Sequence, residues 1–319
     1  MKASILIPAY NAAQHLEATL LSCVDQGADV VEEIIVVDDH SEDDSKAVFS
    51  RIANAHPEFA WKWLTNPSKG ACSARNHALT MATANCIQWL DADDVLGAHK
   101  LSPAIEHLER HPTQLHACGW RSFHGDFEER QFSDDVNWRI IPEFSDPAEW
   151  LARDTFMGLH CYAGHRNLFE QAGPWNESLA INQDGEYFAR VIARSSGVIF
   201  TQETEVYYRR SSSDSVSKFS PEKADSLYRS TESMVQTGLA IEDSERMRQM
   251  AANRWQHFIY TAYPHCPDGI AKAQDKLQNL PTPTISNPNA VSLPSKMVST
   301  VFGWRALTKL RQLRDKLSP

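Results

Sequence analysis

The stretch Gln88-Trp-Leu-Asp-Ala-Asp-Asp-Val95 is an apolar strand end that runs directly into three carboxylates, Asp91, Asp93 and Asp94. Carboxylates this close repel one another, and a cation bound between them relieves that repulsion. Alternation along an extended strand end predicts that Asp91 and Asp93 point to one side and Asp94 to the other. Oxygen ligands at the carboxyl end of a strand suit Mg²⁺ or Mn²⁺, which proteins often share with substrate phosphates. The alternative is a solvated acidic turn that caps the next helix.

Strand-like and helix-like segments alternate on the way to this stretch. Apolar, β-rich runs predict buried strands, and segments with apolar residues at helical spacing predict helices between them. The expected strands cover residues 3–7, 33–37, 61–64 and 86–90, and the expected helices cover 12–26, 45–54 and 70–83. This alternation predicts an α/β fold with a Rossmann-like, mostly parallel sheet flanked by helices.

The polar clusters of this half all follow expected strands: Tyr10-Asn11, Asp38-Asp39 and the acidic stretch at 91–94. Ligands of parallel α/β sheets bind at the carboxyl ends of the strands, near the point where strand order reverses. These placements therefore predict one shared binding site at that edge of the sheet.

The pattern continues downstream and then changes. Further helices are expected at 100–110, 146–154, 167–172 and 181–194, and further strands at 116–123, 160–165, 198–200 and 205–209. The acidic segment 125–135 is expected to be a surface hairpin or loop. We expect four parts along the chain: a main domain at 1–220, a helical extension at 221–279, a proline-rich linker at 280–295 and a basic amphipathic helix at 296–319.

Composition limits the classes of protein that the sequence fits. The chain has 319 residues, of which 42% are hydrophobic, and its formal net charge is −10, so a surface that wraps nucleic acid is not expected. The six cysteines are far apart and include no C-x-x-C, which indicates reduced thiols in a cytoplasmic protein. We expect no signal peptide, because the N-terminal apolar run is short and ends at Pro8, and no spanning helix, because no apolar run reaches 18 residues.

The expected C-terminal helix combines an apolar face with basic charge. Its apolar face comprises Val298, Phe302, Ala306, Leu310, Leu313 and Leu317, and six basic residues against one acidic residue give it a net charge of +5. Such a helix after a linker suits peripheral contact with the inner, anionic face of a membrane, with Phe302 and Trp304 as interfacial anchors. The alternative is a helix docked on the acidic main domain.

Four short motifs occur in order along the first third of the chain: Ile7-Pro-Ala-Tyr-Asn11, Val36-Val-Asp-Asp-His-Ser41, Ala74-Arg-Asn76 and Leu90-Asp-Ala-Asp-Asp94. With them, the sequence resembles the inverting family-2 glycosyltransferases of the GT-A fold over residues 3–210. The resemblance implies metal-dependent transfer of a sugar from a nucleotide-diphosphate sugar, most commonly a UDP-sugar. The acceptor implied is a hydroxyl of a glycan or lipid-linked molecule, as in polysaccharide or cell-surface glycan biosynthesis.

The resemblance implies that the exit of the first strand binds the nucleotide. Pro8, Ala9 and Tyr10 are then expected against the base and ribose. Asp39, with Asp38 beside it, is expected to contact the edge of the base, where a carboxylate can accept a hydrogen bond from an imino N–H.

The same resemblance assigns the diphosphate and the metal. Arg75 is expected close to the base and diphosphate. Asp91 is expected to contact the ribose and, with Asp93, the Mg²⁺ or Mn²⁺ ion. The ion bridges the donor diphosphate and neutralises the charge that builds on the departing nucleotide.

Inversion requires a base that takes the proton of the acceptor hydroxyl. The family places it in an acidic pair, commonly Glu-Asp, and the matching pair here is Gln183-Asp184, so the resemblance implies that Asp184 is the base and that Gln183 replaces the usual acid. Arg209 or Arg210, ahead of Ser215-Val-Ser217, resembles the family's phosphate-covering loop, where an arginine can pair with the diphosphate. The alternative for either arginine is a surface position.

Two other functions are weighed against this one. A sugar-phosphate nucleotidylyltransferase needs a glycine-rich basic loop after the first strand, and Pro8-Ala-Tyr-Asn11 has no glycine. A non-catalytic nucleotide-sugar-binding or assembly protein on the same fold would be marked by loss of the base or metal carboxylates, and both are present.

Overall fold

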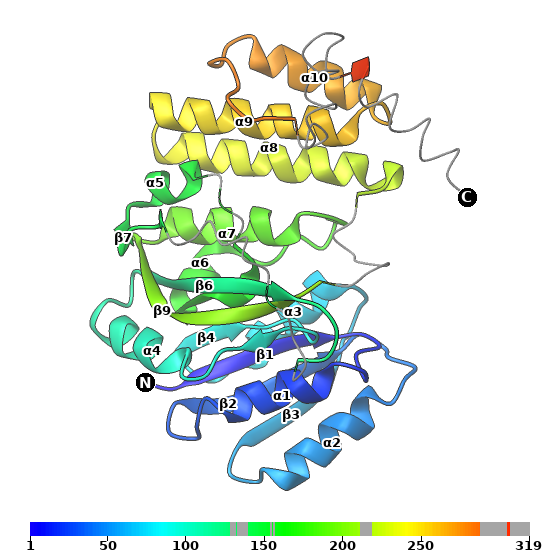
Figure 1. Ribbon diagram of the computed structural model, residues 1–319, viewed down its shortest axis with the longest axis vertical. Coiled ribbons are helices and arrows are strands. Elements are labelled where there is room, and N and C mark those ends of the chain that lie inside the picture. The colour runs from blue at the N-terminus through cyan, green and yellow to red at the C-terminus, as the bar shows by residue number, and fades with distance from the viewer. Residues whose placement is uncertain are drawn as a thin grey trace. The chain divides into compact units, whose positions relative to one another are not determined.

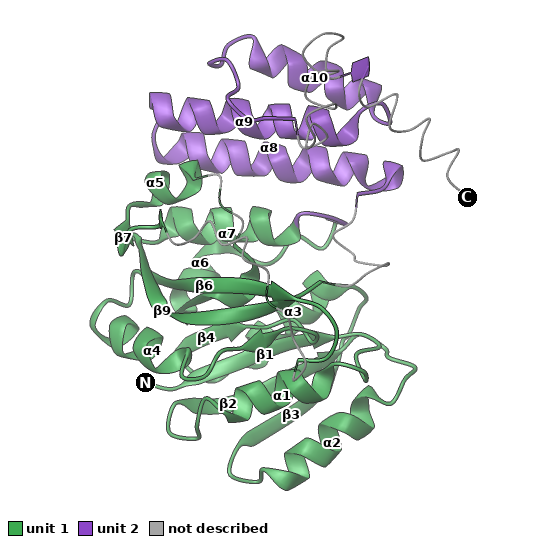
Figure 2. Cartoon of the chain, viewed as in Figure 1, with its two compact units in different colours: residues 1–178, 183–215 green, residues 179–182, 216–319 purple. Residues whose placement is uncertain are grey.

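The computed structural model describes residues 1–127, 132, 140–153, 155, 157–210, 219–287 and 305–306. The chain divides into two compact units (Figure 2): Met1–Ser178 with Gln183–Ser215, and Leu179–Asn182 with Val216–Pro319. The first unit therefore ends close to the boundary expected at residue 220, and residues 179–182 join the second unit although no sequence signal marks them. The expected helix at 296–319 lies outside the described residues, apart from Arg305 and Ala306.

One mixed sheet runs through the first unit in the order β3-β2-β1-β4-β8-β6-β9-β5, with β7 paired to β9 (Figure 1). Its strands are β1 Ala3–Ala9, β2 Val31–Asp38, β3 Ala60–Thr65, β4 Cys86–Trp89, β5 Val95–Leu96, β6 Leu115–Phe123, β7 Phe144–Ser145, β8 Tyr162–His165 and β9 Val198–Arg209. The sheet is parallel from β3 to β4, β8 is antiparallel to both of its neighbours, and β9 is parallel to β6. The predicted α/β architecture is confirmed.

Helices connect the strands of this unit and cover the sheet. They are α1 Leu16–Val24, α2 Ser45–Ala55, α3 Ala71–Met81, α4 Leu101–Arg110, α5 Pro147–Ala152, α6 Arg166–Ala172 and α7 Gln183–Arg194, with the short 3₁₀ helix η2 at Leu159–Cys161. Every residue of β1 is buried, as expected for a parallel strand with both faces covered. The apolar run that begins the chain therefore forms the middle of the core.

Two details of the sheet differ from the sequence expectation. The strands expected at 198–200 and 205–209 are one strand, β9, because a register shift opposite Cys118 and Gly119 lets it pass its polar middle without breaking. The two-residue strand β5 has no sequence signal, since its existence depends on pairing with the distant β9. That pairing places the end of β9 beside the acidic stretch.

The second unit is helical, with α8 Ala224–Ile241, α9 Glu245–Ala262 and α10 Pro267–Leu277 after the short helix η3 Pro221–Lys223. The expected helical extension is interrupted at residues 242–244, where the Ser244 hydroxyl accepts a hydrogen bond from the N–H of Met247 and begins α9. Trp255 and Phe258 are fully buried in its core. None of the described helices is long and apolar enough to cross a membrane.

Part of the expected linker is held in place within this unit. Thr284 donates its N–H to Asn253 Oδ1 on α9 at 2.8 Å, and Gln249 Nε2 donates to the carbonyl of Thr282 at 3.0 Å. The first residues of the segment 280–295 therefore lie against α9, and residues 288–295 lie outside the described part.

All six cysteines are free thiols. Five of them are buried, and burial raises the pKa of the Cys86 thiol to about 12 and that of Cys72 to about 11. Cys266, which precedes α10, is half-buried.

The buried carboxylate of Glu33 joins three strands of the first unit. It accepts hydrogen bonds from Ser4 Oγ at 2.6 Å and from the Thr83 N–H and hydroxyl, and lies 2.5 Å from Lys62 Nζ. Burial alone would raise the pKa of Glu33, but the bonds from Lys62, Ser4 and Thr83 outweigh it, so the pKa lies below its ordinary value of 4.5.

We expect Glu33→Gln to lower the free energy of unfolding at pH 7 by about 1–3 kcal/mol, because it leaves buried donors poorly paired. A depressed folded-state pKa contributes stability above pH 4.5 that is lost as the pH falls through the folded-state value. Urea unfolding at pH 7 and pH 3 checks this. The difference between wild type and variant should shrink in acid, whereas Glu32→Gln, at the exposed neighbouring position, should change little at either pH.

Candidate functional site

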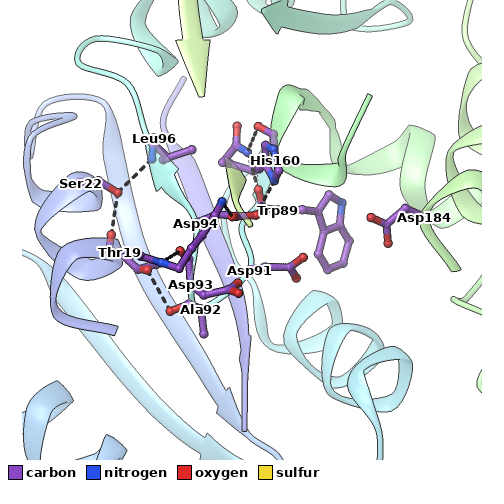
Figure 3. Close-up of polar contacts among 12 residues, drawn as sticks. Thr19, Ser22, Trp89, Asp91, Ala92, Asp93, Asp94, Leu96, His160 and Asp184 are labelled. Atoms are coloured by element: carbon purple, nitrogen blue, oxygen red, sulfur yellow. Dashed lines mark hydrogen bonds and ion pairs between the residues drawn. The ribbon is translucent and has the colours of Figure 1, made fainter. Parts of the chain in front are cut away.

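The acidic stretch forms a tight turn immediately after β4. The Asp94 N–H donates to the carbonyl of Asp91 at 3.2 Å, Thr19 Oγ1 of α1 donates to the carbonyl of Ala92 at 2.9 Å, and Arg209 Nε of β9 donates to the carbonyl of Asp93 at 2.9 Å. Figure 3 shows the turn between Thr19 on one side and His160 on the other. The chain has therefore already turned at Asp91, yet the side chain of Asp94 points toward His160 and those of Asp91 and Asp93 do not (Figure 3).

Asp94 is a structural partner inside the protein, with only 1% of its surface exposed. Its Oδ1 accepts the N–H of Arg209 at 2.8 Å, and its Oδ2 lies 2.8 Å from Nδ1 of the fully buried His160. Burial alone would lower the pKa of His160, but the Asp94 carboxylate outweighs it and raises that pKa well above its ordinary value. The two side chains form a buried ion pair.

Asp93 carries the unbalanced charge of the turn. Burial, followed by the negative charges of Asp94 and Asp91, raises the pKa of Asp93 to about 7. A divalent cation at Asp93 would remove that penalty, and its carboxylate oxygens are the ligands that Mg²⁺ and Mn²⁺ prefer. The described residues contain no cluster of three or more His, Cys, Asp or Glu side chains arranged for a metal. Asp93 and Asp91 would hold such an ion only together with ligands from outside the protein, such as water or a bound phosphate.

Arg75 brings together carboxylates from distant parts of the chain. This α3 residue is 5% exposed and stacks over the Trp175 ring at 4.6 Å. Its Nη2 donates to Asp91 Oδ1 at 2.8 Å, while its Nη1 donates to Gln183 Oε1 at 3.2 Å and lies 3.9 Å from Asp184 Oδ1. One buried cation thus contacts both the acidic turn and the beginning of α7.

Asp184 has the properties of a base that a substrate can reach. Although 34% of its side chain is exposed, burial around the carboxyl raises its pKa to about 6, against the lowering effect of Arg75 and with a further increase from Asp91. The charge of His160 also lowers this pKa. A carboxyl poised near pH 6 can accept a proton in neutral solution.

The residues expected to bind the nucleotide lie at the carboxyl ends of β1 and β2. Pro8 and Ala9 are buried within β1, whereas Tyr10, directly after it, is 62% exposed. Asp39 accepts hydrogen bonds from Asn66 Nδ2 at 2.7 Å and from the Gly70 N–H at 2.8 Å, so it holds the loop between β3 and α3.

Asp38, the last residue of β2, accepts the Ser41 N–H at 3.1 Å. It therefore shapes the loop that follows its own strand. Tyr10, Asp38 and Asp39 all lie at the edge of the sheet formed by the carboxyl ends of β1 and β2. Their contacts with a nucleotide remain predictions.

The two arginines at the end of β9 have different surroundings. Arg209 is buried, stacks over Phe123 at 4.5 Å, and donates to the backbone carbonyls of Asp93 and Gly125. Arg210 is exposed at the point where the described segment ends. The expected phosphate-covering residues 215–217 lie outside the described part of the chain.

Sequence reasoning missed two residues of this site. Trp175 stacks on Tyr187 with ring centroids 3.9 Å apart, and the face of its ring also contacts the guanidinium of Arg75. His160 had no local signal, because its partner Asp94 is distant in sequence. The only available signal was the third carboxylate of the acidic stretch, which needed a counter-charge once it was buried.

Comparison with known proteins gives a consistent picture. The family model described as Glycosyl transferase family 2 matches residues 4–173. The Escherichia coli UDP-Glc:alpha-D-GlcNAc-diphosphoundecaprenol beta-1,3-glucosyltransferase WfaP is 36% identical over 106 residues, which cover 33% of this chain and 41% of WfaP. The match covers only 32% to 45% of the length of the first curated relatives, so the chain spans less than half of each.

Solved structures share the fold over most of the chain. The structure of S. aureus TarS 1–349 in complex with UDP-GlcNAc superposes with a TM-score of 0.62 at 16% identity, covering 88% of this chain and 82% of that one. The mannosyltransferase PcManGT from Pyrobaculum calidifontis, in complex with GDP-Man and Mn²⁺, gives a TM-score of 0.59 at 18% identity and covers 99% and 88%. At these identities the likeness establishes the fold.

The raised pKa of Asp93 leads to a stability prediction. Its pKa of about 7 lies above the ordinary 3.8, so ionising this group destabilises the metal-free fold progressively as the pH rises from 3.8 to 7. We expect Asp93→Asn to raise the melting temperature at pH 8 in EDTA, and to change it little at pH 4. Differential scanning fluorimetry measures both.

Addition of Mn²⁺ at pH 8 should raise the melting temperature of the wild type and not that of Asp93→Asn. Asp126→Asn removes an exposed carboxylate of the same unit and should respond to Mn²⁺ like the wild type. A lower melting temperature for Asp93→Asn at pH 8 would contradict the assignment of unbalanced charge to this residue.

Proposed function

The chain belongs to glycosyl transferase family 2, and we propose that it is an inverting, metal-dependent glycosyltransferase. In this proposal it moves a sugar from a UDP-sugar to a hydroxyl of a glycan or lipid-linked acceptor during the synthesis of a polysaccharide or cell-surface glycan. The family match covers the half of the chain that holds Tyr10, Asp39, Arg75 and the acidic turn.

The contact of Arg75 with both Asp91 and Asp184 supports this proposal most directly. Asp91 belongs to the acidic turn that would hold the donor, and Asp184 belongs to α7, where the family's base is expected. Both carboxylates therefore lie beside one buried guanidinium, which brings the proposed donor site close to the proposed base. An inverting transfer needs a base near the donor, because the acceptor hydroxyl loses its proton as the new bond forms.

The reaction then follows from the residues of the chain. Asp184 accepts the proton of the acceptor hydroxyl while the acceptor oxygen forms its bond to the anomeric carbon. The bond between that carbon and the diphosphate oxygen breaks, and its electron pair leaves with the nucleoside diphosphate. Arg75 keeps Asp184 ionised by lowering its pKa against the effect of burial.

Asp93 and Asp91 would hold the Mg²⁺ or Mn²⁺ ion, which when bound neutralises the charge developing on the departing diphosphate. Thr19 and Arg209 fix the backbone carbonyls of Ala92 and Asp93 within this turn, so the carboxylates keep their positions before the donor arrives. A protein scaffold stabilises the charge that develops in a reaction by holding its polar groups in position beforehand.

The proposed substrates draw on the names of relatives. WfaP is named as a transferase from UDP-Glc to a diphosphoundecaprenol-linked sugar, and TarS was crystallised with UDP-GlcNAc. We extend the UDP-sugar and the lipid-linked acceptor from these proteins to this chain. The exposed ring of Tyr10 and the carboxylate of Asp39 suit a uracil base, through stacking and hydrogen bonding respectively.

The test of this function is a panel of nucleotide diphosphates and nucleotide sugars, assayed by thermal shift with and without Mn²⁺. We expect selective stabilisation by UDP and one UDP-sugar that requires the metal, followed by transfer to a polyprenyl-diphosphate sugar. Nuclear magnetic resonance of the product should show an anomeric configuration opposite to that of the donor. Retention of configuration, or no stabilisation by any nucleotide, would overturn the proposal.

We expect Asp184→Asn to lower kcat about 100-fold or more, because the amide cannot accept the proton of the acceptor hydroxyl. The KM for donor should remain close to that of the wild type, and Glu170→Gln, an exposed carboxylate on α6, should have no effect. Steady-state kinetics with varied donor measure both parameters. A large increase in donor KM with unchanged kcat would assign Asp184 to donor binding instead.

The pH dependence of kcat/KM offers an independent check. Because the pKa of Asp184 is about 6 and only the ionised form can act as base, the rate should fall as the pH decreases below about 6. The residual activity of Asp184→Asn should lack this acidic limb. A wild-type profile that stays flat down to pH 5 would contradict the role of Asp184.

A further inference from the structure

A buried polar network lies behind the acidic turn, on the side away from α1. Gln88, in β4 just before the turn, donates from Nε2 to the carbonyl of His160 at 3.0 Å and accepts a hydrogen bond from the fully buried Lys100. Lys100 precedes α4, and burial lowers its pKa. The strand that leads into the turn therefore fixes the backbone of His160.

The ring of His160 contacts two further elements. Its Nδ1 pairs with Asp94 Oδ2 at 2.8 Å, and its plane stacks on Tyr208 of β9 with centroids 5.8 Å apart and planes inclined by 22°. Gly158 leaves room for the ring, since a Cβ at that position would lie 2.8 Å from His160 Cε1. Backbone, pairing and stacking together fix the position of this imidazole.

The same residue also acts on the other half of the site through its charge, because the charge of His160 lowers the pKa of Asp184. The short helix η2, Leu159–Cys161, therefore carries a side chain that pairs with the acidic turn and favours ionisation of the proposed base. Arg75, from α3, contacts both Asp91 of the turn and Asp184.

We propose that His160 is a positioning residue, which fixes Asp94 and thereby the acidic turn through its ring. The inference rests on the proposed function, and it assigns to His160 no contact with substrate. Loss of its ion pair with Asp94 should lower kcat, because a small displacement of the turn that holds the donor is costly to the rate.

The experiment compares two substitutions of His160 in the full-length chain. His160→Phe retains an aromatic ring but removes the polar group that pairs with Asp94, whereas His160→Asn retains a polar N–H group close to the position of Nδ1. We expect His160→Phe to lower kcat about tenfold or more and to change donor KM by less than about threefold. His160→Asn should retain several times more of the wild-type kcat than His160→Phe.

The matched control is His116→Phe. His116 is also a fully buried histidine of the first unit, in β6, and its Nε2 hydrogen-bonds to Thr201 Oγ1 at 2.9 Å, away from the acidic turn. We expect its replacement to reduce the melting temperature comparably while kcat remains near that of the wild type. The comparison separates a general loss of stability from a specific loss of positioning.

Two further variants keep the test decisive if His160→Phe does not fold. Gly158→Ala retains His160 but pushes its ring away from Asp94, and we expect it to lower kcat as well. Asp94→Asn should lower kcat, and the double variant with His160→Asn should lose no more than the more damaging single change, because both act through one contact.

Separate outcomes would overturn the two proposals. If the wild type transfers sugar but His160→Phe and Gly158→Ala keep the kcat of His116→Phe, the positioning role is wrong and the proposed function stands. If the losses from Asp94→Asn and His160→Asn multiply independently, the coupling through one contact is also wrong. A wild type that transfers no sugar from any nucleotide sugar removes the proposed function, and the positioning role with it.

Discussion

The site depends on the contacts that the buried guanidinium of Arg75 makes with two carboxylates. This guanidinium carries the positive charge that Asp91 and Asp184 need, and it lies on the face of Trp175, which in turn stacks on Tyr187 of α7. Removal of one member of this buried group of charges is destabilising, because it leaves a remaining charge without its partner in surroundings of low polarity. The strand end, α3 and α7 are therefore held together by charge as well as by apolar packing.

Ionisation of two carboxyl groups in the site is unfavourable in the folded protein. Asp93 and Asp184 have raised pKa values because burial and neighbouring carboxylates oppose their ionisation. Glu33, in contrast, is surrounded by donors and has a lowered pKa. Both kinds of carboxylate belong to the first unit, and this contrast distinguishes the carboxylate that stabilises the fold from those expected to meet a charged ligand.

The local parts of this structure could be predicted from the sequence, and the contacts between distant segments could not. The strands β1, β2 and β4 are short apolar runs that end in polar residues, so their positions and the shared edge of their carboxyl ends follow from pattern alone. The shape of the acidic turn depends on Thr19 and Arg209, which local alternation cannot represent. His160 likewise becomes significant only after β8 has been placed beside β4. The break between α8 and α9 was accessible, because Ser244 is a typical residue for beginning a helix.

The distribution of thiols has a practical consequence for anyone who wishes to follow this protein in solution. Burial suppresses ionisation of Cys72 and Cys86, and a thiol that stays protonated reacts slowly with alkylating reagents. Cys266, half-buried ahead of α10, is the thiol of the six that solvent reaches most readily. A maleimide dye should therefore attach there first, giving a single fluorescent reporter in the helical unit without mutagenesis and without touching the acidic turn.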